Sequence, residues 1–564
     1  MAVADEVDSV PVDANAVETP DWPLRPWLLA GLLGIAGLLI HFFTHEKDDV
    51  PWRVAVAAFL FFGSLAAAFT VERHRWKEPV AFAVVIGLVM AGLAWRAVNY
   101  GDYLADEQYG FASGVVATAL ALPLFQAGFL RTRLRTSYAA IYHHIWTDAI
   151  SAAGALAFTG LSWLALAILS ELFRLLKIDL LHDLMNQAWF GWTYSGVAFG
   201  GALGVLRNQL KVLATLQTIV LLVLSLIAVP LAVGLVVFLL ATAISGPHVL
   251  WEATRNATPI LLTCAAGAFV LTSVILRQDD PAMTGSRLMR IAAFALAAVI
   301  LPLAVFAAVS LGLRLDQYGL APERLWGLVA VIVACAWGVG YWGALIRGRK
   351  ANWARRLREA NFNLAVGSCG LALLLALPIL NFGAISAGNQ LHRLASGKVK
   401  PDKFDFAALR WDFGEAGKRA LAGLAKSPNA RIAELARAAI EQKQRTYFAG
   451  EQKVRADSDY PLRVQPDDPI LRQWVLAYLK ANSYECQDAC VALDLGSIPN
   501  GRRKVALVSA QGYTVLAISA GGDAEILSNA GGPTLKPSSK VEIRKVPRRF
   551  IYIDGKPMPM PLDD

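Results

Sequence analysis

Two histidines and an aspartate lie close together in the chain, at His143, His144 and Asp148, directly after Tyr142. If this segment is helical, His144 and Asp148 share one face, because residues four apart are neighbours on a helix. A carboxylate beside an imidazole can orient it for proton transfer or for binding a metal. One such pair is too few for a zinc site, which needs three or four ligands. The alternative is structural, with Asp148 near a helix N-terminus and the aromatic rings at the lipid headgroups.

A second group of charges follows further along the chain. Glu171 and Arg174 are three residues apart, and Lys177, Asp179 and His182 come next. One interpretation is that these side chains line a vestibule outside the membrane. The other is that the segment forms a short amphipathic helix lying at the membrane surface. Neither group predicts a metal ion or a cofactor.

The cysteines divide into two classes. Cys264, Cys335 and Cys369 lie inside apolar runs, where a thiol packs as a small apolar side chain. Cys486 and Cys490 lie in the more polar C-terminal region, and disulfides persist outside the cytoplasm. The pair therefore predicts a structural bridge in an exported domain. Its spacing differs from that of Cys-x-x-Cys redox motifs, so redox activity and free thiols are the less favoured alternatives.

The elements that must position these residues are membrane helices. The chain of 564 residues is 56% apolar and 17% charged, against about 45–50% and about 25% in soluble domains. Crossing about 30 Å of hydrocarbon takes about 17–25 apolar residues, and backbone groups in lipid must pair internally, as in a helix. Eleven runs meet this requirement: 27–43, 54–71, 79–95, 110–130, 149–169, 188–206, 216–240, 259–276, 291–313, 325–345 and 362–380. The weakest is 188–206, which is rich in glycine.

Several function classes lose support from what the sequence lacks. The centres of the eleven runs hold essentially no ionisable residue, which disfavours a pump with carboxylates embedded in the membrane. No phosphate-binding loop, no Gly-x-Ser-x-Gly elbow and no His-Glu-x-x-His motif occurs. The net charge of +9 is spread over many loops, so no nucleic-acid-binding face is expected. The sequence therefore predicts neither catalytic residues nor nucleic-acid partners.

The loops between the runs predict an orientation. Loops after the second, fourth, sixth, eighth and tenth runs carry 17 lysines and arginines, and the five alternate loops carry 8. Because basic loops stay in the cytoplasm, the first set is predicted to be cytoplasmic. With eleven crossings, the N-terminus lies inside and the C-terminal region outside, in the periplasm of a bacterial inner membrane.

The predicted fold is an all-α polytopic membrane bundle of about eleven transmembrane helices with a C-terminal soluble region, helical and then small α+β. Residues 1–24 form an acidic tail, predicted to be disordered rather than a cleaved signal. The bundle covers 25–390, a helical juxtamembrane region 391–450, and an exported domain 465–564. After a linker at 450–466, that domain is expected to contain a helix and six strands: 470–481, then 491–495, 504–509, 513–519, 525–527, 541–546 and 550–553. A basic cluster around 541–546 would be a solvated strand face or a site for an anionic glycan or lipid.

Several stretches resemble one family, the multi-pass bacterial membrane proteins known as domain of unknown function 4153. They include YHHIWTDA at 142–149, FTGLSW at 158–163, ELFRLLKI at 171–178 and RLDQYGLAPERLW at 314–326, together with GKVK at 397–400 and FDFAALR at 404–410. The resemblance covers roughly residues 25–430. It implies the membrane bundle and no activity.

The most specific of these stretches contains Gln317, Tyr318, Gly319, Pro322 and Arg324. It is predicted to form a polar turn on the outer side, between the ninth and tenth runs. Glycine can take turn conformations that are closed to other residues, and proline suits the first turn of a helix. A structural turn is the first interpretation, and an outer loop that faces a ligand is the alternative.

The functional prediction is a non-enzymatic envelope protein of the inner membrane. Its partners would be the lipid bilayer and an envelope protein, glycan or lipid bound by the exported C-terminal domain. The alternative is a transporter or flippase of an amphipathic or lipid-like substrate, because Pro123, Pro230 and Pro302 interrupt three runs and broken helices often mark transport sites. A membrane enzyme that uses His144, Asp148 and Glu171 is a third possibility.

Overall fold

The structure is a computed structural model. It describes residues 22–45, 50–101, 107–246, 257–442, 460–482, 489–499, 501–509 and 512–530, together with a few short pieces between and after these ranges. The acidic tail and most of the basic cluster around 541–546 lie outside the described residues. The chain forms two compact units, Met1–Lys443 and Gln444–Asp564. Each is described by itself.

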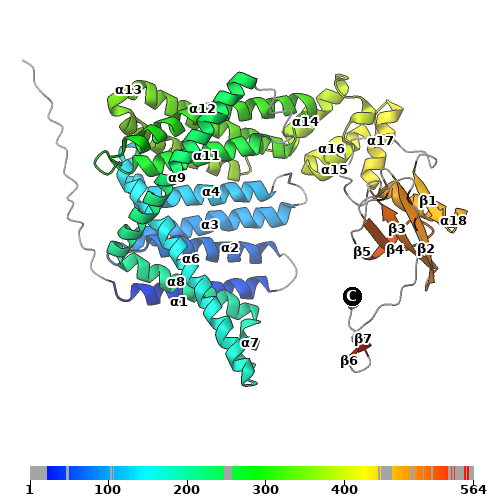
Figure 1. The fold of residues 1–564 in the computed structure, drawn as a ribbon, viewed down its shortest axis with the longest axis horizontal. Helices are drawn as coiled ribbons and strands as arrows, with labels where there is room; N and C mark the ends of the chain where they lie inside the picture. Colours follow the sequence, from blue (N-terminus) through cyan, green and yellow to red (C-terminus); the bar gives the residue numbers. More distant parts are fainter. Residues whose placement is uncertain are drawn as a thin grey trace, which may run out of the picture. The chain divides into compact units, whose positions relative to one another are not determined.

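The first unit is helical, and its long helices pack side by side, with α6 running obliquely across several of them (Figure 1). In chain order the elements are α1 (Arg25–Thr44), α2 (Pro51–Thr70), α3 (Lys77–Tyr100), α4 (Glu107–Gln126), α5 (Phe129–Thr132), η2 (Arg133–Arg135), α6 (Tyr138–Leu175), α7 (Leu180–Met185), α8 (Ala188–Asn208), α9 (Leu210–Ser245), α11 (Ala257–Leu276), α12 (Arg287–Tyr318), α13 (Pro322–Ala376), α14 (Phe382–Ala395), η3 (Pro401–Lys403), α15 (Phe406–Trp411), α16 (Gly414–Leu424) and α17 (Ala430–Glu441).

The predicted membrane bundle is confirmed. Within the described residues, ten helical segments are long and apolar enough to cross a membrane. They match ten of the eleven predicted runs, and α13 supplies two of them, Pro322–Gly348 and Asn352–Ala376. The remaining run, 188–206, corresponds to α8, which is 21 residues long but is not apolar enough to be counted among the ten. Large apolar side chains on these helices remain exposed, among them Leu161 and Ile244, as expected of surfaces that face lipid.

Helix α8 lies antiparallel along the whole of α1. A Cβ atom added to Gly196 or Gly200 would overlap the carbonyl oxygen of Leu33 or Leu29, and one added to Gly204 would lie 2.5 Å from the Cα of Pro26. These glycines are spaced four apart, as in membrane helices whose backbones touch. These contacts run from Gly204 beside Pro26 to Trp192 beside Gly37, so α8 is placed as a helix that crosses the membrane together with α1 would be. The glycines lower the hydropathy of α8, and the same glycines allow its close contact with α1.

Helix α13 folds back on itself. The Tyr341 hydroxyl donates to Asn361 Oδ1 at 2.7 Å, although the two residues are 20 apart in sequence. The Trp337 indole N–H donates to Ser368 Oγ at 3.1 Å across 31 residues, which would separate them by about 46 Å in a straight helix. The chain therefore reverses between the segments Pro322–Gly348 and Asn352–Ala376, and each segment is long and apolar enough for one crossing.

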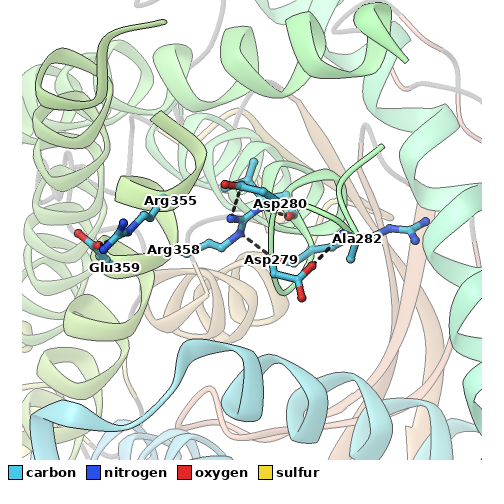
Figure 2. A network of polar contacts seen from close by, with 8 residues as sticks. Asp279, Asp280, Ala282, Arg355, Arg358 and Glu359 are labelled. Carbon is cyan, nitrogen blue, oxygen red and sulfur yellow. Dashed lines mark hydrogen bonds and ion pairs between the residues drawn. The ribbon is translucent and has the colours of Figure 1, made fainter. Parts of the chain in front are cut away.

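One buried arginine joins this hairpin to the end of α11. Arg358, whose side chain is 8% exposed, donates to the carbonyls of Leu276 (2.7 Å) and Arg277 (3.3 Å). It also pairs with Asp280 at 2.7 Å, as Figure 2 shows. The last carbonyls of a helix have no partner within it, so Arg358 caps α11. Arg355 points to Glu359 instead and is 75% exposed (Figure 2).

The sequence predicted short helices after the bundle, and α15, α16 and α17 are found there. They share one apolar core with α14, a helix that the sequence analysis did not anticipate. Phe404, Leu409, Phe413 and Leu421 are buried in this core. It belongs to the same compact unit as the bundle.

The second unit contains a five-stranded sheet in the order β1-β2-β3-β4-β5. Its elements are β1 (Leu462–Gln465), α18 (Pro469–Ala481), β2 (Cys490–Ile498), β3 (Arg502–Ser509), β4 (Gly512–Ile518) and β5 (Ala524–Ala530), with a separate pair β6 (Tyr552–Ile553) and β7 (Lys556–Pro557). Strand β1 is parallel to β2, and the other neighbours in the sheet are antiparallel. Helix α18 packs on one face through Leu471, Val475 and Leu479.

Most predicted elements of this unit have a counterpart, and one expectation is wrong. The predicted linker 450–466 contains β1, a four-residue strand that stands directly before Pro466. It was overlooked because so short a run carries little alternation. Asp468 caps the start of α18 by accepting from the amides of Ile470 and Leu471. The Arg503 guanidinium beside it, together with those amides, holds the pKa of the Asp468 carboxyl below its usual range.

Candidate functional site

A cavity of about 940 Å³ opens where several helices of the first unit end or begin. Its wall is formed by the starts of α1, α3, α6 and α9, the ends of α2, α4 and α8, the α5 segment, and Cys369 of α13. Three of the predicted site residues, His143, His144 and Asp148, lie on this wall. They occupy the first turns of α6, so the cavity brings them together with residues from distant parts of the chain.

Four arginines line the cavity, Arg25, Arg75, Arg131 and Arg207, and two of them, Arg25 and Arg207, are held in place by backbone carbonyls. Arg207, in the last turn of α8, donates to the carbonyl oxygen of Ala68 on α2. Its own carbonyl accepts from Arg25 Nη1 at 2.9 Å. Both guanidinium groups are therefore held by backbone carbonyls. Within the described residues, neither forms an ion pair with a carboxylate.

Asp148 and Gln126 form the acceptor part of the wall. The Gln126 amide donates to the carbonyl of Phe69 at 2.9 Å and lies within hydrogen-bonding reach of the Asp148 carboxylate. Three buried polar atoms of this cluster have no hydrogen-bond partner in the described part of the chain: Asp148 Oδ2, Gln126 Oε1 and Arg25 Nε. Buried polar atoms in proteins are normally paired, so these three are unusual.

The rest of the wall is mainly apolar. Phe82 of α3 and Phe125 of α4 stack with their ring centroids 4.1 Å apart, and both line the cavity. Val85 and Leu130 lie at its edge, 56% and 71% exposed. Charged groups also occur at the edge, where Arg131 pairs with Glu78. The cavity is therefore amphipathic, with a charged region beside an aromatic and aliphatic surface.

Glu171 and Arg174 are not part of this site. They lie at the other end of α6, and 23 residues of helix separate Asp148 from Glu171 by about 35 Å. Arg174 pairs with Glu171 at 3.0 Å and with Asp179 at 3.8 Å. A single active site built from His144, Asp148 and Glu171 is incompatible with this separation. The short helix α7 follows at this end, where the sequence suggested an interfacial segment.

The polar turn between α12 and α13 is tied to α14. Arg393 donates to the carbonyls of Asp316 and Gln317, both at 2.9 Å, and Gln390 donates to those of Tyr318 (2.9 Å) and Leu320 (2.8 Å). The turn is closed from its own side by Arg324, which donates to the Gly319 carbonyl at 2.8 Å.

Gly319 has φ +74°, and a Cβ atom there would lie 2.7 Å from the Arg393 side chain. Pro322 begins α13. With its carbonyls occupied in this way, the turn serves as an attachment point for α14. This favours the structural interpretation over a ligand-facing loop.

Cys486 and Cys490 are joined by a disulfide, with Cα atoms 5.4 Å apart. Both are fully buried in the core between α18 and the sheet. Within the described residues, no group of three or more His, Cys, Asp or Glu side chains is arranged to hold a metal ion.

The family described as Domain of unknown function (DUF4153) matches residues 33–424. The chain belongs to this family. The match begins within α1 and ends with α16, so most of the cavity and the polar turn between α12 and α13 lie inside the DUF4153 region, whereas the sheet of the second unit lies outside it. No curated protein and no solved structure matches the chain.

The sequence indicates only part of the cavity. Arg207 directly follows an apolar run and Arg25 precedes the first one, so no pattern in the sequence connects either of them with Asp148. The two arginines are 182 residues apart, and only the close α1–α8 contact brings them together. Gln126 is a stronger signal in the sequence, since it is one of three amide side chains in the eleven apolar runs.

Proposed function

We propose that this DUF4153 protein is an inner-membrane protein that holds an amphipathic, lipid-like molecule in the cavity, as a transporter or flippase would. The observation that carries the proposal is the composition of the wall, in which Arg25, Arg207 and Asp148 adjoin an apolar surface that includes Phe82 and Val85. A volume of about 940 Å³ suits a small organic ligand. Such a wall matches a molecule with a charged head and a hydrocarbon tail.

The orientation expected from the loops fits this proposal. The arginines around the cavity, Arg75, Arg131 and Arg207, belong to the basic set of loops, which is expected to face the cytoplasm. The cavity would then open at the level of the inner-leaflet headgroups, and a lipid could enter with its head toward the arginines.

Filling the cavity tests the proposal. Val85→Trp adds a large side chain at the cavity edge, and we expect it to weaken binding of a fluorescent phospholipid to the purified protein at least about tenfold by steric exclusion, equivalent to about 1.4 kcal/mol. Val84→Trp is the matched control, because Val84 is exposed on the same helix and does not line the cavity. Equal binding by the two variants would contradict the proposal.

A second candidate function rests on the second unit. The buried disulfide between Cys486 and Cys490 supports an exported domain, which would bind an envelope protein, glycan or lipid. If α8 is the eleventh crossing, a cytoplasmic N-terminus puts the C-terminus outside the cytoplasm, which agrees with an exported domain.

Protease treatment of intact spheroplasts tests the location of this domain. We expect a C-terminal epitope to be removed and Cys486 and Cys490 to resist thiol labelling until they are reduced. A protected epitope with freely labelled thiols would place the domain in the cytoplasm and end this second candidate.

A further inference from the structure

We propose that the cavity recognises a zwitterionic head group, in which an ammonium is linked to a phosphate, with the ammonium at Asp148 and the phosphate at Arg25 and Arg207. The inference rests on the proposed function and adds the class of ligand. The shared chemistry is that of phosphoethanolamine, either as the head of a phospholipid or as the free phosphate ester.

The part of the wall that contains Asp148 and Gln126 needs a ligand group that donates hydrogen bonds. Asp148 Oδ2 and Gln126 Oε1 are buried and have no partner within the described residues. The Gln126 oxygen and the ionised Asp148 carboxylate accept hydrogen bonds and cannot donate them. An ammonium has three N–H donors and no acceptor, so it matches both atoms. A purely anionic head group would leave Asp148 unpaired and would be repelled by its charge.

The part of the wall that contains Arg25 and Arg207 needs a ligand group that accepts hydrogen bonds. Arg25 Nε is buried without a partner in the described part of the chain, although Nη1 of the same group is held by the Arg207 carbonyl. Arg207 is held in turn by the carbonyl of Ala68. These bonds fix both guanidinium groups and leave some of their N–H donors for a ligand, and phosphate oxygens suit guanidinium geometry. A simple cation would leave these donors unused.

The two unmet requirements occur on one wall beside an apolar surface. Arg131 and Glu78 neutralise each other at the edge. Among the residues that the structure describes, the charged side chains of the wall that form no ion pair are the carboxylates Asp148 and Glu72 and the arginines Arg25, Arg75 and Arg207. The wall therefore offers both signs of charge to a ligand. A ligand with both charges satisfies both sides at once. The adjoining Phe82 and Val85 suit the acyl chains of a lipid better than a free phosphate ester.

Binding competition with the full-length protein in detergent tests the inference. The probes are dioleoylphosphatidylethanolamine, its N-methylated derivatives up to phosphatidylcholine, dioleoylphosphatidylglycerol and soluble phosphoethanolamine. We expect the wild type to bind phosphatidylethanolamine about tenfold more tightly than phosphatidylglycerol, the effect of one well-placed charge pair of about 1.4 kcal/mol. Affinity should fall with methylation, because each methyl group removes an N–H donor.

Asp148→Asn should remove the preference for phosphatidylethanolamine over phosphatidylglycerol while binding of phosphatidylglycerol persists. Glu171→Gln, on the same helix outside the cavity, is the control and should keep the preference. If Asp148→Asn does not fold, the methylation series in the wild type still tests whether the cavity recognises the N–H donors of an ammonium. Strong competition by soluble phosphoethanolamine would assign the site to the free ester, and its failure to compete would assign it to the lipid.

Equal affinity of the wild type for all three lipid classes, combined with weaker binding by Val85→Trp, would overturn this inference and leave the proposed function standing. Lipid binding that is insensitive to Val85→Trp would overturn the proposed function itself. An unchanged preference in a folded Asp148→Asn variant would also overturn the inference.

Discussion

Replacing Gly200 with leucine is expected to destabilise the protein by about 3 kcal/mol, the upper end of the usual cost of overpacking. The reason is geometric, since even a Cβ atom at this position overlaps the carbonyl oxygen of Leu29 in α1. A backbone atom cannot move aside as a flexible side chain can, so the two helices must separate. Thermal unfolding of the purified protein in detergent, followed by circular dichroism, measures the loss.

Gly191→Leu is the matched control, because Gly191 lies on the same helix and an added Cβ atom there meets nothing within 4 Å. Its midpoint temperature should stay close to that of the wild type. Equal losses in both variants would mean that α8 does not pack along α1 as described. The eleventh crossing would then lose its support.

Arg358→Ala is the second large effect we expect, also about 3 kcal/mol. The substitution leaves the carbonyls of Leu276 and Arg277 without their donor, and hydrogen bonds to charged groups contribute about 1.5–3 kcal/mol each. The exposed Asp280 can be hydrated after the change and adds little. Thermal unfolding in detergent again gives the measurement.

Arg355→Ala, three residues away, provides the comparison. Its side chain is 75% exposed and pairs with Glu359 on its own helix, and such surface pairs contribute about 0.3–0.5 kcal/mol. A loss of similar size in the two variants would show that Arg358 does not cap α11. The hairpin of α13 would then need another explanation for its position.

The sequence predicts the helices well because lipid imposes a strict requirement on length and hydropathy. It fails at their ends. The predicted run 149–169 covers only part of α6, a helix of 38 residues. The prediction is too short because the polar residues in the first turns of this helix resemble a loop. Those turns carry His143, His144 and Asp148, so the error falls on the candidate site.

The sequence is also ambiguous in α8, where glycines lower the hydropathy of the helix and at the same time allow it to pack closely. The glycines of α8 weaken its membrane signal, yet they are what allow its contact with α1. The disulfide spacing and the strands β2 to β5 were accessible from local pattern. The cavity was not, because Arg25, Gln126, Asp148 and Arg207 come from four different helices, and no local pattern connects them.

The central claim is that a lipid-like molecule occupies the cavity, and photocrosslinking tests it most directly. The full-length protein would be reconstituted with phosphatidylethanolamine that carries a photoreactive group in its acyl chain, and labelled peptides would be mapped by mass spectrometry. We expect labelling concentrated on the α3 segment with Phe82 and Val85 and on the start of α9 with Leu210 and Leu213, all of which line the cavity. Val85→Trp should reduce this labelling, and Val84→Trp should not. Labelling spread evenly over the lipid-facing helices and unchanged by Val85→Trp would contradict the claim.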